Sequence, residues 1–267
     1  MVEKATSKFS KQEFKPRFSA GLFYAYFYPM SKVIVECCAN SVQSAINGQA
    51  GGAERIELCA NLEQGGTTPS AASICLAREA LEVDLYVLIR PRAGNFVYSE
   101  LELEEIIQDI EFCKEIGCDG VVVGALNTDG SVNEQQTKTM AQAAQPMGVT
   151  FHRAFDVAKD VEQALESIIK CGCERLLTSG QATQAIEGVK VFQKLVAKAN
   201  NRIEIMAGSG VNANNVLTLY PLGIRQFHLS GTDVIAQEEN AFSFGSKLLQ
   251  TNPQKIQEVA DALEGLA

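Results

Sequence analysis

Several features are missing from this 267-residue chain, and each absence removes a class of function. After its first thirty residues it has no long apolar segment, which argues against a membrane span. The net charge is −9, and charged residues occur in ones and twos rather than in blocks. Neither nucleic acid nor an anionic membrane is therefore the expected partner. No Cys-x-x-Cys pair and no His-Glu-x-x-His motif is present, so no such motif competes with the cysteines discussed below.

A short phrase does occur twice near the start, as Glu-Cys-Cys-Ala-Asn at 36–40 and Glu-Leu-Cys-Ala-Asn at 57–61. Each phrase closes an apolar run that we interpret as a short buried strand. Side chains alternate along a strand with period two, so the first and third residues of each phrase, a glutamate and a cysteine, share a face. Neighbouring parallel strands lie ~4.8 Å apart and a metal–sulfur bond is ~2.3 Å long, so Cys38 and Cys59 can share one metal ion.

The same order of strand and then helix continues to the C-terminus. Strongly apolar runs are predicted as strands at Val33–Cys38, Arg55–Ala60, Asp84–Pro91, Gly120–Leu126, Val149–Phe155, Arg175–Gly180, Arg202–Gly208 and Gln226–Gly231. Helical spacing follows such runs, for example at Ser70–Glu82, Glu100–Ile116, Asp160–Cys171 and Pro253–Leu266. Eight such units in this length predict a closed (β/α)8 TIM-type barrel. A doubly wound open sheet is the alternative, but the first strand is not followed by a glycine-rich dinucleotide loop.

The chain divides into an extension at 1–30 and a single barrel domain at 31–267. The extension is basic and rich in phenylalanine and tyrosine, and its apolar part at 22–30 is short and lacks a small-x-small cleavage site. We therefore favour a disordered tail or an upstream-extended start over a signal peptide. The eight cysteines lie mainly on predicted strands and helices of a large domain, which favours a reduced, cytoplasmic protein over a disulfide-bonded one.

Several longer motifs, in this order and spacing, resemble the CutC copper-homeostasis family from about Lys32 to the end. They are Val35-Glu36-Cys37-Cys38, Gly51-Gly52-Ala53-Glu54-Arg55-Ile56-Glu57-Leu58-Cys59, Glu63-Gln64-Gly65-Gly66-Thr67-Thr68-Pro69-Ser70, Ile89-Arg90-Pro91-Arg92, Thr150-Phe151-His152-Arg153-Ala154-Phe155-Asp156 and Leu177-Thr178-Ser179-Gly180. The resemblance implies a (β/α)8 barrel, a cytoplasmic role in copper tolerance and a homo-oligomer. It also implies that Cys38 and Cys59 are Cu(I) ligands.

Metal chemistry is consistent with this implication, because soft thiolates select Cu(I) and Cu(I) accepts few ligands. Inward residues of neighbouring barrel strands alternate in layers, so Cys38 and Cys59 are expected to be offset along the barrel axis. A further contact from Glu36, Glu57 or His152 would compensate for that offset. The close alternative pair of thiols, Cys171-Gly172-Cys173, is expected to mark a turn.

The competing hypothesis is an enzyme that acts on a small anionic phosphate or carboxylate substrate. Barrel active sites lie at the C-terminal ends of the strands, where this sequence is unusually polar. The candidate catalytic residues are Glu36, Glu57 and His152. The candidate anion-binding residues are two arginines and a glycine-rich cradle, namely Arg90, Arg92, Gly208, Gly210, Ser230 and Gly231. Structural roles are the alternatives: the arginines pair with Glu36 and Glu57, the glycines form turns, and His152 is a hydrogen-bonded core residue.

Overall fold

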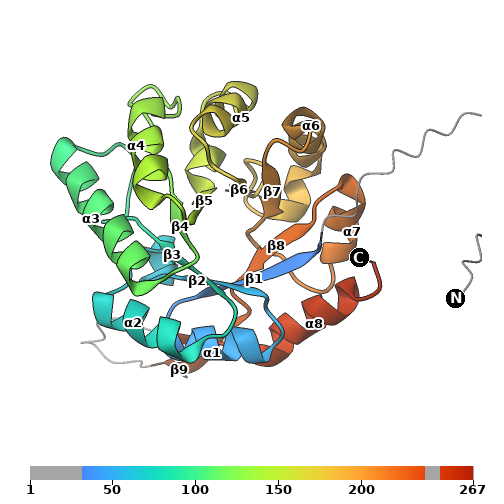
Figure 1. The fold of residues 1–267 in the computed structure, drawn as a ribbon. Helices are drawn as coiled ribbons and strands as arrows, with labels where there is room; N and C mark the ends of the chain where they lie inside the picture. Colours follow the sequence, from blue (N-terminus) through green and yellow to red (C-terminus); the bar gives the residue numbers. More distant parts are fainter. Residues whose placement is uncertain (1–31, 238–246, 267) are drawn as a thin grey trace, which may run out of the picture. The chain divides into compact units, whose positions relative to one another are not determined.

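The structure is a computed structural model that describes residues 32–237 and 247–266. Eight parallel strands form a closed barrel in chain order, with β8 pairing with β1 (Figure 1). This confirms the predicted (β/α)8 fold. The barrel strands are β1 (Ile34–Ala39), β2 (Arg55–Leu58), β3 (Asp84–Leu88), β4 (Gly120–Val123), β5 (Gly148–Phe151), β6 (Arg175–Thr178), β7 (Glu204–Ala207) and β8 (Gln226–Leu229). The proposed extension at 1–30 lies outside the described residues.

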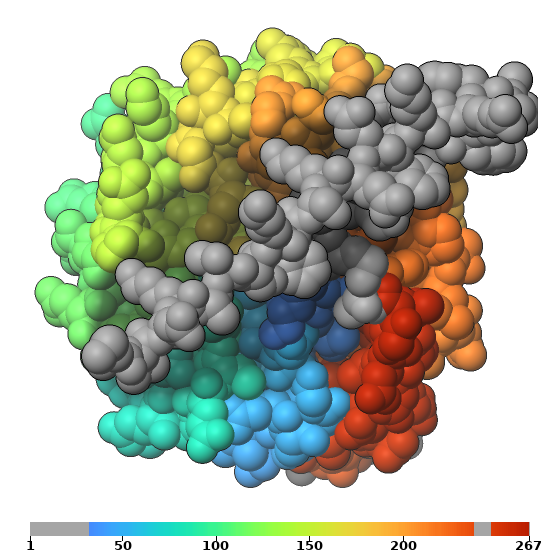
Figure 2. Space-filling model, turned by 45° about the vertical axis from the view of Figure 1, so that its right-hand side comes forward, coloured from blue at the N-terminus to red at the C-terminus, as the bar shows by residue number. Residues whose placement is uncertain are grey.

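Helices connect the strands and form the outer layer. They are α1 (Val42–Ala50), α2 (Ala71–Ala80), α3 (Glu100–Ile116), α4 (Glu134–Ala144), α5 (Val161–Lys170), α6 (Val189–Ala199), α7 (Val216–Leu219) and α8 (Pro253–Leu263). Short 3-10 turns are η1 (Leu62–Gln64), η2 (Arg153–Val157), η3 (Ala185–Gly188) and η4 (Tyr220–Leu222). The colours in Figure 2 follow the chain around the ring, and α8 packs beside α1.

Polar side chains cap the starts of several of these helices. Ser70 accepts a hydrogen bond from the Ser73 N–H, and Asp160 accepts from the first turn of α5. Each side-chain oxygen satisfies N–H groups that have no partner within the helix. These caps fix where the chain turns from each strand and loop into the outer layer.

Seven of the eight strands end earlier than the sequence predicts, and the difference is largest for β3, β4 and β5, whose last predicted residues turn into the loops at the mouth. The predicted strand at 149–155 stops at Phe151, where the His152 side chain accepts a hydrogen bond from the Ala154 N–H and begins η2. The predicted strands at 84–91 and 120–126 likewise stop at Leu88 and Val123. Apolar residues recur after each of these ends, at Ile89, Ala125 and Ala154, so hydrophobicity alone does not locate them.

An antiparallel ribbon that the sequence analysis does not predict follows β8. It consists of β9 (Thr232–Gln237) and β10 (Lys247–Thr251). The segment from the end of β1 through α1 holds β10 in place, since Asn40 and Asn47 donate to the Leu249 and Thr251 carbonyls. The ribbon therefore connects the closing strand of the barrel to α8.

The largest apolar core lies between the strands and the outer helices. A second, smaller cluster of buried residues comprises Cys38, Cys59, Tyr86, Leu88 and Val122, all at positions that face the barrel interior. Among the described residues, no helix is both long and apolar enough to cross a membrane. The small interior cluster therefore contains both cysteines of the candidate site.

Candidate metal centre at the barrel mouth

The two cysteines of the repeated phrase meet inside the barrel. Cys38 lies on β1 and Cys59 directly follows β2, and their Sγ atoms are 3.9 Å apart. Both are almost completely buried, with 5% and 2% of their surface exposed. The strands pair so that Cys38 is level with Glu57, which places Cys59 two residues farther along the same face. The predicted axial offset is present, but it leaves the two sulfurs in contact.

Glu57 lies beside the thiol pair. The Cys38 thiol donates to its Oε1 at 3.6 Å, while its Oε2 is buried and has no hydrogen-bond partner among the described residues. Burial raises the pKa of Glu57 to about 7, and the Glu36 carboxylate contributes in the same direction. The hydrogen bond to Cys59 and burial raise the pKa of Cys38 well above that of an ordinary thiol. Without a cation, the Cys38 sulfur therefore carries its proton.

Glu36, two residues before Cys38 on β1, forms a buried ion network. Its Oε1 is 2.7 Å from His228 Nδ1, and its Oε2 accepts from Arg55 at 3.1 Å. Burial opposes ionisation of Glu36, but His228 and Arg55 outweigh it and lower the pKa to about 2. The nearby carboxylates likewise outweigh burial at His228 and raise its pKa. Glu36 is thus a fixed negative charge that orients the imidazole.

Arg55 and His228 are functional neighbours whose pairing the sequence analysis missed. It assigned Arg90 and Arg92 as the alternative partners of Glu36 and Glu57, whereas Arg55 and His228 fill that role at Glu36. Two features, one of the sequence and one of the fold, indicate these partners of Glu36. Arg55 precedes Glu57 by two residues and so shares its inward face, and closure of the barrel places β8 against β1.

Both predicted anion-binding arginines form hydrogen bonds with the loops at the barrel mouth. Arg90 donates to the backbone carbonyls of Gln64, Gly66 and Gly94. Arg92 donates to Glu102 at the start of α3 and to the Asn95 and Val97 carbonyls. Their side chains therefore hold the loops after β2 and β3, and anion binding by Arg90 and Arg92 stays a prediction.

The predicted glycine-rich cradle lies after β7 and β8. Gly208 donates its N–H to the Thr178 carbonyl, and a Cβ at this position would lie 2.5 Å from a Leu177 methyl group. Gly210 and Gly231 have φ angles of +70° and +54°, which glycine adopts readily. Ser230 accepts a hydrogen bond from Thr251 at its carbonyl. These contacts agree with turn and close-packing roles, and a bound anion remains untested.

His152 lies at the end of β5 and is 5% exposed. Its Nδ1 accepts from the Ala154 N–H at 3.2 Å, so the ring proton belongs on Nε2. Nε2 is buried without a hydrogen-bond partner among the described residues. Burial and the charge of Arg90 lower the pKa of His152 to about 3, which keeps the ring neutral. The structure does not place His152 in the cluster of Cys38, Glu57 and His228.

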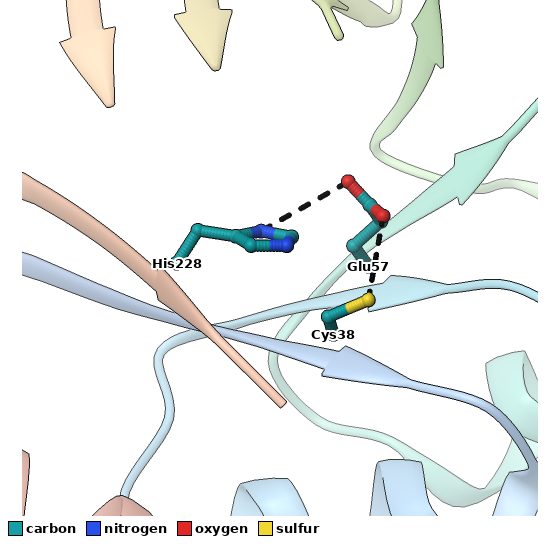
Figure 3. A group of neighbouring side chains, drawn as sticks. All are labelled: Cys38, Glu57 and His228. Carbon is teal, nitrogen blue, oxygen red and sulfur yellow. Dashed lines mark hydrogen bonds and ion pairs between the residues drawn. The ribbon is translucent and has the colours of Figure 1, made fainter. Parts of the chain in front are cut away.

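All eight cysteines are thiols rather than disulfides. Cys171 caps α5 and Gly172 follows with a φ of +87°, so the Cys-Gly-Cys segment forms the expected turn. The donor atoms that do converge belong to Cys38, Glu57 and His228, and they lie within 4.8 Å of one another (Figure 3).

The structure thus defines a single-domain (β/α)8 barrel with buried thiols, a carboxylate and an imidazole near the C-terminal ends of neighbouring strands. Comparison with known proteins gives the family. The CutC family model matches residues 33–233, and this chain belongs to the CutC family.

Relatives cover most of the chain. A CutC family protein from Bacteroides fragilis is 41% identical over 247 residues, which is 89% of this chain and 98% of the relative. One from Xylella fastidiosa is 49% identical over 203 residues, covering 76% of each chain. The solved structure of a protein described as copper homeostasis protein CutC from Streptococcus agalactiae is 35% identical. It superposes with a TM-score of 0.71, covering 74% of this chain and 98% of that one.

Proposed function

We propose that this chain is a cytoplasmic Cu(I)-binding protein of copper homeostasis. The single observation that carries the proposal is the 3.9 Å separation of the buried Cys38 and Cys59 sulfurs. Two soft sulfur donors in one place select a soft monovalent ion. The description of the Streptococcus agalactiae relative as a copper homeostasis protein supports the same function.

The two sulfurs pass a simple test of fit. Two metal–sulfur bonds of ~2.3 Å span at most ~4.6 Å, so a separation of 3.9 Å lets one ion contact both atoms. Neither cysteine needs to change strand or face. The surrounding side chains of Leu88 and Val122 are 4% and 0% exposed, so the thiols are held away from bulk water.

Cys38 and Glu57 hold the protons of this pocket. The Cys38 thiol donates to Glu57, whose raised pKa of about 7 allows it to hold a proton at neutral pH. A bound cation favours the thiolate form of both cysteines, because metal ligands of this type must be deprotonated. Reduced thiols are required throughout, which agrees with the cytoplasmic location proposed here.

Anaerobic titration of the reduced protein with Cu(I), against a competing chelator, tests this function. We expect one Cu(I) per chain, and we expect Cys38→Ser and Cys59→Ser each to lose most of the affinity. Cys113→Ser is the matched control, because Cys113 is also buried but lies on α3 in the outer layer. Equal Cu(I) affinity in all four proteins would refute the proposal.

A second candidate function is catalysis on a small anionic substrate at the same mouth. Buried donor atoms without partners among the described residues favour it, namely Arg90 Nε and His152 Nε2. A thermal-shift screen with phosphate, sulfate and small carboxylates tests this candidate. An anion that binds the folded state at a hundredfold excess over its Kd adds about 2.7 kcal/mol to the free energy of unfolding. Arg90→Met should abolish that gain, and no shift with any anion at millimolar concentration would remove the candidate.

A further inference from the structure

Three side chains of different donor chemistry converge beside the thiol pair. Cys38 comes from β1. Glu57 comes from β2 and His228 from β8, and these two strands flank β1 in the closed barrel. One ligand atom of each lies within 4.8 Å of the other two, and the three residues are only 4–8% exposed. Sulfur, carboxylate oxygen and imidazole nitrogen are the three donors that zinc-type ions accept.

His228 is held in the manner of a metal-ligating histidine. Its Nδ1 lies 2.7 Å from the fully buried Glu36, and Arg55 holds the second oxygen of that carboxylate. A carboxylate on one ring nitrogen fixes the orientation of the ring, and metal-ligating histidines almost always have such a partner. Figure 3 shows the imidazole lying beside Glu57 and Cys38.

Glu57 supplies an unsatisfied acceptor at the same point. Its Oε2 is buried and has no hydrogen bond within residues 32–237 and 247–266, and the imidazole Nδ1 is 4.0 Å away, which is too far for one. Leaving a buried carboxylate oxygen without a partner is costly, and such atoms in native proteins require an explanation. A cation bound between these side chains would provide the missing partner.

We propose that Cys38, Glu57 and His228 form a binding site for a borderline divalent ion of the Zn²⁺ type. Three protein ligands leave the fourth tetrahedral position for water or a small anion. The thiol of Cys38 also belongs to the proposed Cu(I) pair, so the two ions compete for it. The inference rests on the proposed function only for this competition, and the divalent site itself stands on its own three ligands.

Two variants separate the two ions, because each ion has a ligand that the other does not use. Cys59→Ser removes a sulfur from the Cu(I) pair and leaves the divalent triad intact. Glu57→Gln keeps the size of the side chain, removes the anionic donor and leaves both thiols. His228→Gln is a third variant, and Glu57→Gln serves in its place if loss of the Glu36 contact prevents folding.

The experiment uses the reduced full chain and Co²⁺ as a visible probe for the divalent site, with Zn²⁺ as competitor. Wild type should bind one Co²⁺ per chain with the strong absorption of tetrahedral, thiolate-ligated cobalt, and Zn²⁺ should abolish it. Glu57→Gln and His228→Gln should bind Co²⁺ at least about tenfold more weakly, and His228→Gln should change the Cu(I) affinity less than about threefold. Cys59→Ser should show the reverse pattern.

Each outcome decides between the two ions. If wild type binds no Co²⁺, or if Glu57→Gln and His228→Gln both bind it as tightly as wild type, the divalent site is refuted. If Co²⁺ binds as described while Cu(I) affinity does not depend on Cys59, the divalent site is supported and the Cu(I) proposal fails. Cu(I) added to the Co²⁺ form should displace cobalt from wild type, and simultaneous binding of both ions would refute the shared Cys38.

Discussion

Glu36 and His228 lie opposite each other at the seam where β8 closes the barrel against β1, with a carboxylate oxygen 2.7 Å from the imidazole Nδ1. The carboxylate is completely buried and also accepts from Arg55. The barrel thus closes around a charged network rather than around apolar side chains alone. One candidate metal ligand, His228, belongs to this network, and another, Cys38, lies two residues beyond Glu36 on β1.

Breaking this network should destabilise the fold. Arg55→Met removes one of the two cationic partners of Glu36, and breaking a buried ion pair typically lowers the free energy of unfolding by about 3–5 kcal/mol. Urea unfolding at neutral pH measures the change. Lys194→Met is the control, since it breaks an exposed pair with Glu162 and should have no measurable effect. Equal stability of the two variants would contradict the structural role of Arg55.

Gly120 should be intolerant of any side chain. It faces the barrel interior on β4, and a Cβ there would overlap the ring carbons of Tyr86. Overpacking of a filled core costs typically ~1–3 kcal/mol, so Gly120→Ala should unfold at a lower urea concentration. Replacing the ring in the double variant with Tyr86→Leu should make the alanine less damaging than it is alone. An alanine equally well tolerated in both backgrounds would argue against close packing at this position.

His152 should make stability depend on pH in the acid range. Its pKa is about 3 in the folded protein, below the ordinary value of 6.5, because burial disfavours the charged ring. Between these pH values the unfolded chain binds the extra proton, so stability falls as pH decreases below 6.5. The loss attributable to His152 at pH 5 is about 2 kcal/mol.

The matched variant is His152→Gln, which cannot titrate but can still accept from the Ala154 N–H. Its unfolding free energy should decrease less than that of wild type when the pH is lowered from 7 to 5. The difference between the two decreases isolates His152 from the other titrating groups. Parallel decreases in both proteins would mean that His152 is not neutral in the folded state.

Local pattern was enough to predict the barrel and the shared face of the glutamate and the cysteine in each repeated phrase. The period of two along β1 and β2 places Glu36 with Cys38 and Glu57 with Cys59, as the structure confirms. The partners of Glu36 depend on which strands become neighbours on closure and on their register, which no local pattern encodes. For the same reason the structural alternative that paired Arg90 with these carboxylates was wrong, since the loops after β2 and β3 supply its partners.

The ends of the strands were the other weak point. Apolar residues recur after β5, at Ala154 and Phe155. The His152 cap nevertheless ends the strand at Phe151 and begins η2. The β9–β10 ribbon was not predicted because α1 stabilises it through side-chain contacts to the β10 backbone. The ribbon depends on tertiary contacts, which override local propensity. The end of β5 is set by a local side-chain cap, which hydrophobicity does not indicate.

The central claim is that one Cu(I) is shared by the sulfurs of Cys38 and Cys59. X-ray absorption at the copper edge of the anaerobically loaded protein measures the ligands directly. We expect two sulfur neighbours at ~2.3 Å in wild type and in Cys113→Ser, and one sulfur or no bound copper in Cys59→Ser. A wild-type spectrum without two sulfur neighbours, or one that is unchanged in Cys59→Ser, would contradict the claim.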